Sequence, residues 1–174
     1  MDNILVHLTA VLNTTPQRWH QLTQNFQDDL LRRKPLAGEW SALECLTHLI
    51  DIEAIFFSRV QSFLAGENFP AFDPNKQGTK LSNTASATQI AEQFAAVRAK
   101  SLTLINTITT DDLSREANHS ELGLVTLSQM LHEWAGHDLM HTVQAERAMM
   151  QPFIDGCGAW KPYFADHIAT SSSD

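Results

Sequence analysis

Apolar residues recur at three- and four-residue steps along most of the chain, which is the spacing of helices that bury one face. The first run of this kind consists of Ile4, Leu5, Leu8, Val11 and Leu12. The same spacing returns in three longer stretches, which predict helices over about 42–64, 88–108 and 127–150. No stretch shows the two-residue alternation of a half-buried strand, and no internal repeat is visible.

The helix starts and breaks carry local signals. Ser41 with Glu44, and Thr126 with Gln129, form S/T-x-x-E/Q capping boxes before the second and fourth stretches. Trp40 and Gly66 occupy the positions of a hydrophobic staple and of a helix stop around the second stretch. The Thr15-Pro16 pair resembles an N-cap followed by proline at the first helical position, so we expect a break in the first helix there.

Four main helices with long connections predict an all-α four-helix bundle over residues 1–151. The connection over residues 67–85 holds two prolines and a glycine, and its length suggests a functional or capping segment. Residues 152–163, at the start of a C-terminal extension over residues 152–174, are rich in Pro, Gly and aromatic side chains and show no helical period. We expect this C-terminal extension to pack over the end of the bundle, with the polar residues 170–174 disordered.

Composition narrows the class of protein. The chain has 174 residues, 43% of them hydrophobic and 18% charged, which fits one globular domain with a core. Its formal net charge of -8 argues against a protein that binds nucleic acid. Two cysteines imply no disulfide framework, and no segment resembles a signal peptide or a membrane span. We therefore expect a cytoplasmic protein with no membrane contact.

The strongest chemical signal is a pair of histidines in the last helix. His137 and His141 are four residues apart, so they lie on one helix face, one turn from each other. Two imidazoles at this spacing can share a metal ion, and a bundle would supply a third ligand from a facing helix. His48, near the start of the second helix, is the best candidate. Its position leaves two roles open, a metal ligand or a hydrogen-bonded core histidine.

Three neutral imidazoles would leave coordination positions open, which is typical of a catalytic metal site. Glu133 lies one turn before His137 and could be a fourth ligand, an acceptor behind a ligand or a general base. Gln144 could hydrogen-bond a bound water, although a surface amide is its simpler interpretation. Asp138 is rotated about 100° from the histidine face, so we expect it to contact a neighbouring element.

Two further residues, His132 and Cys45, are possible ligands of the site. His132 is rotated about 140° around the helix from His137, which makes it a poor fourth ligand. Cys45 shares a face with His48 and could be a soft ligand or a reactive thiol, but a small buried core residue is the favoured interpretation. We interpret Phe56, Phe57 and Phe63 as core packing.

Three segments together resemble one family. They are residues 38–49 with Trp40, Ser41 and His48, residues 119–123 ending at a glycine, and the H-D-x-x-H-x-x-Q pattern from His137 to Gln144. Their order and spacing are similar to those of the DinB-like superfamily, which includes bacillithiol transferases and mycothiol-dependent maleylpyruvate isomerases. The resemblance runs to about Met150.

This resemblance implies a bundle with an up-down-down-up course and a divalent metal held by His48, His137 and His141. It also implies homodimers, a small-molecule substrate and the transfer of a low-molecular-weight thiol that the metal activates. Three histidines suit Zn, Ni, Fe, Mn or Cu, so the residues do not select the metal.

Three functional hypotheses follow. The first is a metal-dependent thiol S-transferase, whose substrate pocket would be lined by residues 67–85 and the C-terminal extension. The second is a metal-dependent hydrolase in which Glu133 or Gln144 orients or deprotonates a water. The third is a stress-response or interaction protein without enzymatic activity, in which Glu133 or Cys45 closes a structural metal site.

Overall fold

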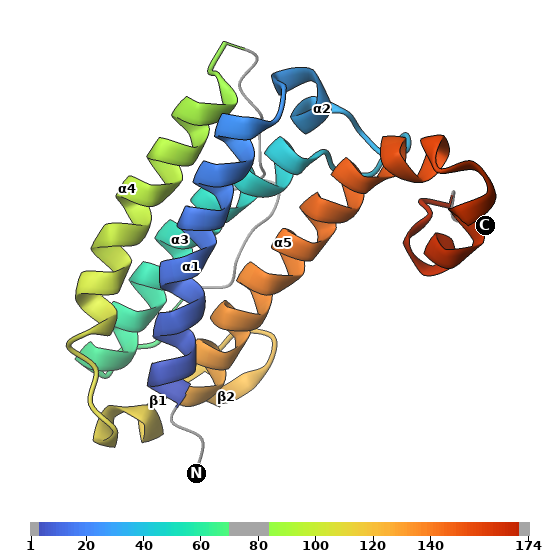
Figure 1. Ribbon diagram of the computed structural model, residues 1–174. Helices are drawn as coiled ribbons and strands as arrows, with labels where there is room; N and C mark the ends of the chain where they lie inside the picture. Colours follow the sequence, from blue (N-terminus) through green and yellow to red (C-terminus); the bar gives the residue numbers. More distant parts are fainter. Residues whose placement is uncertain (1–3, 70–83, 171–174) are drawn as a thin grey trace.

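Four long helices form the body of the protein in the computed structural model, which describes residues 4–69 and 84–170 (Figure 1). They are α1 (Ile4–Asn25), α3 (Ala42–Ala65), α4 (Ala87–Ile105) and α5 (Leu127–Gly156). Helices α1 and α3 each pack against both α4 and α5. Helices α1 and α5 run in one direction and α3 and α4 in the other, as Figure 1 shows. This arrangement confirms the predicted up-down-down-up bundle.

Reciprocal caps set the helix starts. The Ser41 hydroxyl accepts from the amide of Glu44 at 3.3 Å, and the Glu44 carboxylate accepts from the amide of Ser41 at 2.8 Å. Thr126 and Gln129 form the second predicted box at the start of α5. A third box, Ser86 with Gln89, was not predicted, and it starts α4 one residue before the expected Thr88. Helix α4 also ends at Ile105, three residues before the expected Ile108.

The predicted break at Pro16 is wrong, because α1 continues through this proline. A proline inside a helix has no N–H for the carbonyl four residues earlier, which is that of Leu12. That carbonyl instead accepts from Nη1 of Arg98 on α4 at 3.2 Å. The hydrogen-bond donor that replaces the missing N–H of Pro16 therefore comes from another helix, and the residues near Pro16 in the sequence give no sign of it.

A β-hairpin precedes α5, which corrects the expectation that the chain has no strand. β1 (Glu116–His119) pairs antiparallel with β2 (Gly123–Thr126), and His119 faces Gly123 across the turn. Gly123 has φ 74°, the left-handed conformation that glycine adopts readily at the end of a three-residue hairpin loop. Each strand has four residues, which is too short for the period of a strand to be visible in the sequence.

Two short helices complete the connections of the bundle, α2 (Asp28–Arg32) and the 3₁₀ helix η1 (Asp111–Ser114). Neither was predicted. A further 3₁₀ helix, η2 (Gly158–His167), follows α5.

Helix α5 runs to Gly156, past both the expected end at Met150 and Pro152. The C-terminal extension therefore begins inside a helix. Its later residues bond to the last turns of α5: Gln151 donates to the carbonyl of His167 at 2.9 Å and accepts from the amide of Ala169 at 2.9 Å. Figure 1 shows the extension beside that end of α5, away from α4. The predicted disorder over 170–174 falls largely on residues 171–174, which lie outside the described residues, as do residues 70–83 of the long connection.

The core consists of two apolar clusters stacked along the bundle. One contains Leu8, Leu12, Phe56, Phe63 and Trp134, and the other contains Trp19, Leu43, Leu46, Phe94 and Met149. The buried polar residues Glu53, Arg98, Asp138 and His141 come from the stretches of α3, α4 and α5 between these clusters. A polar layer therefore separates the two apolar clusters. Among the helices of residues 4–69 and 84–170, none is long and apolar enough to cross a membrane.

Candidate metal centre

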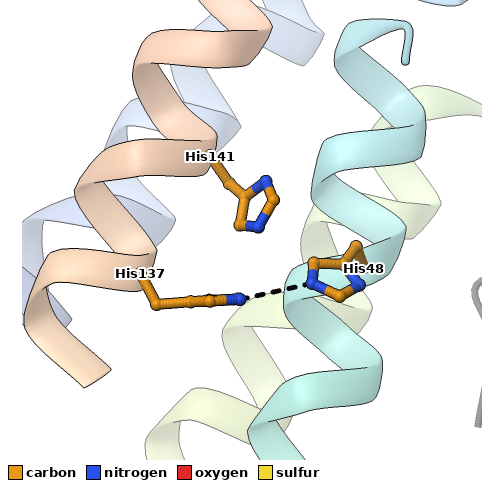
Figure 2. Close-up of side chains that lie close together, drawn as sticks. All are labelled: His48, His137 and His141. Atoms are coloured by element: carbon orange, nitrogen blue, oxygen red, sulfur yellow. Dashed lines mark hydrogen bonds between the residues drawn. The ribbon is translucent and has the colours of Figure 1, made fainter. Parts of the chain in front are cut away.

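Three histidines from two helices converge in the polar layer. His48 on α3 faces His137 and His141 on α5, and Figure 2 shows the three rings directed toward one another. The Nε2 atoms of His48 and His137 are 3.3 Å apart, and one ring nitrogen from each of the three residues lies within 4.8 Å of the others. Two nitrogens bound to one tetrahedral ion at about 2.0–2.1 Å would be about 3.4 Å apart. The three histidines could therefore hold one metal ion.

The imidazoles have the protonation state that metal binding requires. Burial lowers the pKa of His48 to about 4, and the charge of His141 adds to this effect. Burial, with the charges of His141 and His48, lowers the pKa of His137 to about 4 as well. Burial also lowers the pKa of His141, although its bond to Gln144 and the charge of Asp138 act in the opposite direction. At neutral pH the rings are uncharged, so a metal ion need not displace protons from them.

Gln144 orients one of these rings. The ring nitrogen Nδ1 of His141 lies 2.8 Å from Oε1 of Gln144, one turn further along α5. Because the amide oxygen can only accept, Nδ1 carries the proton and donates it, which leaves Nε2 of His141 with the lone pair that a metal needs. The structure thus places Gln144 behind a candidate ligand, where the sequence had suggested contact with a bound water.

The Gln144→Met variant is expected to bind divalent metal about 10- to 100-fold more weakly. Without the Gln144 acceptor, neither the position of the His141 ring proton nor the orientation of the ring is fixed. Zinc titration against a competing chelator measures the change. Gln24→Met is a matched control, since Gln24 contacts His20 at 3.1 Å on the exposed side of α1. Equal affinities for the two variants would contradict the role of Gln144.

Aromatic side chains hold the histidine rings from two sides. Trp40 lies 4.9 Å from the His48 ring and stacks on His141 at 5.6 Å with an interplanar angle of 22°. Phe56 meets His137 edge-on at 5.7 Å and stacks on Trp134. The sequence had assigned Trp40 only to the helix start, because its contact with α5 arises from the packing of the helices. These contacts restrict the rotation of all three candidate ligands.

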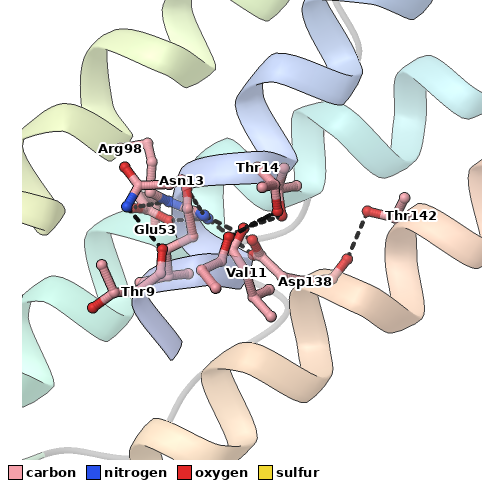
Figure 3. Close-up of polar contacts among 11 residues, drawn as sticks. Thr9, Val11, Asn13, Thr14, Glu53, Arg98, Asp138 and Thr142 are labelled. Carbon is pink, nitrogen blue, oxygen red and sulfur yellow. Dashed lines mark hydrogen bonds and ion pairs between the residues drawn. The ribbon is translucent and has the colours of Figure 1, made fainter. Parts of the chain in front are cut away.

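A buried charge cluster lies in the same layer (Figure 3). Arg98 on α4 donates to Glu53 at 2.7 and 2.8 Å, to Asp138 at 2.7 and 2.9 Å, and to the carbonyl of Leu12 at 3.2 Å. These contacts use all five N–H groups of a guanidinium. The side chains of Arg98, Glu53 and Asp138 are each at most 2% exposed. The prediction that Asp138 contacts a neighbouring helix is confirmed.

This cluster supports the metal centre in two ways. Glu53 shares α3 with His48, and Asp138 directly follows His137, so Arg98 fixes the two helices that carry the candidate ligands. One cation facing two carboxylates leaves a net negative charge in the layer, and the charge of Asp138 acts on His141. A negative field beside neutral imidazoles favours the binding of a cation.

The other candidate residues lie outside the histidine group. Glu133 lines a pocket with Arg59, where burial raises the pKa of the carboxyl group and the Arg59 charge lowers it. Cys45 is fully buried, and burial raises the pKa of its thiol to about 12, which supports the core interpretation. His132 is exposed, with Nδ1 2.7 Å from the carbonyl of Ser128.

The bundle and the site place the chain in a class of helical proteins that have a candidate three-histidine metal centre between two antiparallel helices. The family model of the DinB superfamily matches residues 12–145, and the chain belongs to that superfamily. No curated protein sequence matches it.

Two solved structures from Bacillus subtilis share the fold. YfiT, described as a probable metal-dependent hydrolase with an unusual four-helix bundle topology, is 20% identical with a TM-score of 0.71, over 85% of this chain and 87% of YfiT. The DinB-like protein YjoA is 18% identical with a TM-score of 0.54, over 85% of this chain and 90% of YjoA.

Proposed function

We propose that the protein is a metal-dependent enzyme whose divalent ion is held by His48, His137 and His141. The observation that carries this proposal is the convergence of three neutral imidazoles within 4.8 Å. Within the described residues, no other histidine, cysteine or carboxylate joins this group. Three protein ligands leave positions for a small molecule, which is typical of catalytic rather than structural zinc sites. The absence of Glu133 and Cys45 from the group weighs against a structural site closed by a fourth protein ligand.

We further propose that the reaction is transfer of a low-molecular-weight thiol to an electrophilic small molecule. A divalent ion at such a site lowers the pKa of a thiol or water that it binds, which makes a nucleophile at neutral pH. In this proposal Cys45 does not supply the thiol, because its side chain is fully buried in the core and burial raises the pKa of that thiol to about 12. The chain's own residues orient the site: Gln144 sets the tautomer of His141, and Trp40 packs on two of the three rings.

Hydrolysis is the second candidate, favoured by the description of YfiT as a probable metal-dependent hydrolase. In this reaction water replaces the thiol. Glu133 would be the candidate base, because it lies one turn before His137 on α5 and lines the neighbouring pocket.

Parallel assays of zinc-loaded protein separate the two reactions. One assay follows the reaction of cysteine or glutathione with 1-chloro-2,4-dinitrobenzene, in which an S–C bond forms, chloride leaves and the thiol proton goes to solvent. The other follows hydrolysis of 4-nitrophenyl acetate without thiol. We expect the first activity to require both metal and thiol. Hydrolysis that needs no thiol would favour the second candidate, and equal activities in wild type and His137→Ala would contradict both.

A further inference from the structure

A pocket lies between α3, α5 and the β-hairpin, and one of its lining residues is Glu133, one turn before His137. Its volume is about 190 Å³, far above the roughly 10–15 Å³ that one water needs. Arg59 comes from α3, His119 from β1, and Gln129 and Glu133 from α5. Glu133 is four residues before His137, which corresponds to about 6 Å along the helix axis. A small molecule in this pocket would therefore lie about one helical turn from His137.

Burial lowers the pKa of Arg59 in this pocket, and the charge of Glu133 acts in the opposite direction. Its guanidinium carbon lies 5.1 Å from the centre of the Phe69 ring, and Phe69 is itself packed against Phe63. Its Nε is buried and has no hydrogen-bond partner among the residues that the structure describes. A buried donor that lacks an acceptor costs free energy, so a ligand that supplies an acceptor to Nε of Arg59 would be favoured.

Two more donors face the same pocket. Nδ1 of His119 accepts from the amides of Glu121 and Leu122 at 3.2 and 3.3 Å, so the ring proton is on Nε2, which can only donate. Oε1 of Gln129 accepts from the amide of Thr126 at 2.8 Å in the capping box, and this leaves the NH₂ group of Gln129 for other contacts. The backbone of the hairpin loop occupies the acceptor of His119, and the start of α5 occupies the acceptor of Gln129. Each side chain therefore has only a donor left for a ligand.

We propose that this pocket binds a carboxylate group of the small-molecule substrate, with Arg59 as its charge partner and His119 and Gln129 as further donors. The inference rests on the proposed function, since it assigns a substrate class to the same site. The flat fork of arginine matches a carboxylate. Glu133 lines the same pocket and would repel a doubly charged phosphate more strongly than a singly charged carboxylate. Val125 and Met130 supply apolar walls for the rest of the molecule.

Binding of benzoate tests the assignment, with benzamide and inorganic phosphate as comparison probes. The readouts are the Nε–H signal of Arg59 and the side-chain amide signal of Gln129 in ¹⁵N–¹H NMR spectra of zinc-loaded protein. We expect benzoate to shift both signals and benzamide to shift neither. Arg59→Met should weaken benzoate binding at least about tenfold, and Glu133→Gln should strengthen it through loss of a like charge. Arg33→Met is the matched control and should change nothing, because Arg33 is exposed in the loop before α3.

Three results would overturn the inference. The first is equal benzoate affinity in wild type and Arg59→Met, and Arg59→Gln provides the same comparison if the methionine variant does not fold. The second is benzoate binding that disappears in His137→Ala but persists in Arg59→Met, which would place the anion on the metal. The third is phosphate binding as tight as benzoate binding. If the protein retains no zinc and benzoate still binds through Arg59, the proposed function fails while this inference stands.

Discussion

Replacing His137 with alanine is expected to abolish stoichiometric uptake of a divalent metal. Nε2 of His137 lies 3.3 Å from Nε2 of His48, and His141 completes the group within residues 4–69 and 84–170, so the variant leaves two candidate ligands there. Loss of a partner behind a ligand costs about 10- to 100-fold in affinity, and we expect loss of a ligand itself to cost at least about 100-fold. Metal analysis of protein purified without a histidine tag measures the content directly.

His132→Ala is the matched control for this experiment. It makes the same substitution on the same helix, at an exposed residue turned away from the site. We expect both this variant and the wild type to bind one equivalent of metal. Circular dichroism and thermal unfolding of both variants separate loss of the site from loss of the fold. Equal metal content in His137→Ala and wild type would refute the assigned centre.

Replacing Arg98 with methionine is expected to lower the free energy of unfolding by about 3–5 kcal/mol. Glu53 and Asp138 would face each other as buried carboxylates without a cation, since each now binds Arg98 and is at most 2% exposed. The carbonyl of Leu12 would also lose its donor, and Pro16 cannot replace it. Chemical denaturation at pH 7 measures this loss.

Arg18→Met provides the comparison, because Arg18 binds Glu146 at 2.6 Å in an ion pair that is 53% and 39% exposed. Exposed pairs contribute between 0 and about 1 kcal/mol, so its loss should be small. Adding Glu53→Gln and Asp138→Asn to the Arg98→Met variant should recover part of the stability by removing the two unpaired charges. Similar losses for Arg98→Met and Arg18→Met would contradict the structural role of the buried cluster.

The parts of the fold that were predictable depend on neighbours in the sequence. A capping box needs only residues three apart, so Ser41 with Glu44, and Thr126 with Gln129, located two helix starts correctly. The left-handed stop at Gly66, with φ 72°, is equally local. The spacing of apolar residues then gave the number of main helices, because it reflects one buried face for each helix.

The wrong or missing predictions concern features that neighbouring residues in the sequence do not determine. Pro16 would end an isolated helix, but Arg98 on another helix donates to the carbonyl that the proline leaves free. The hairpin over residues 116–126 was not predicted, because strands of four residues are too short to show the two-residue alternation of apolar and polar side chains. The stacking of Trp40 on His141 was also not predicted, because this contact arises only when α3 packs against α5.

The sequence by itself determined the helical class, the histidine pair of α5 and the family resemblance, since all three reside in spacing along the chain. Only the tertiary structure decided that His48 lies 3.3 Å from His137 and that Gln144 acts on His141 rather than facing solvent. It also decided that Arg59, His119 and Gln129 share one pocket. The physical reason is that a metal ion or a carboxylate is recognised by groups within a few ångströms. The packing of the core sets such distances between separate helices. The spacing of residues along one helix does not specify that packing.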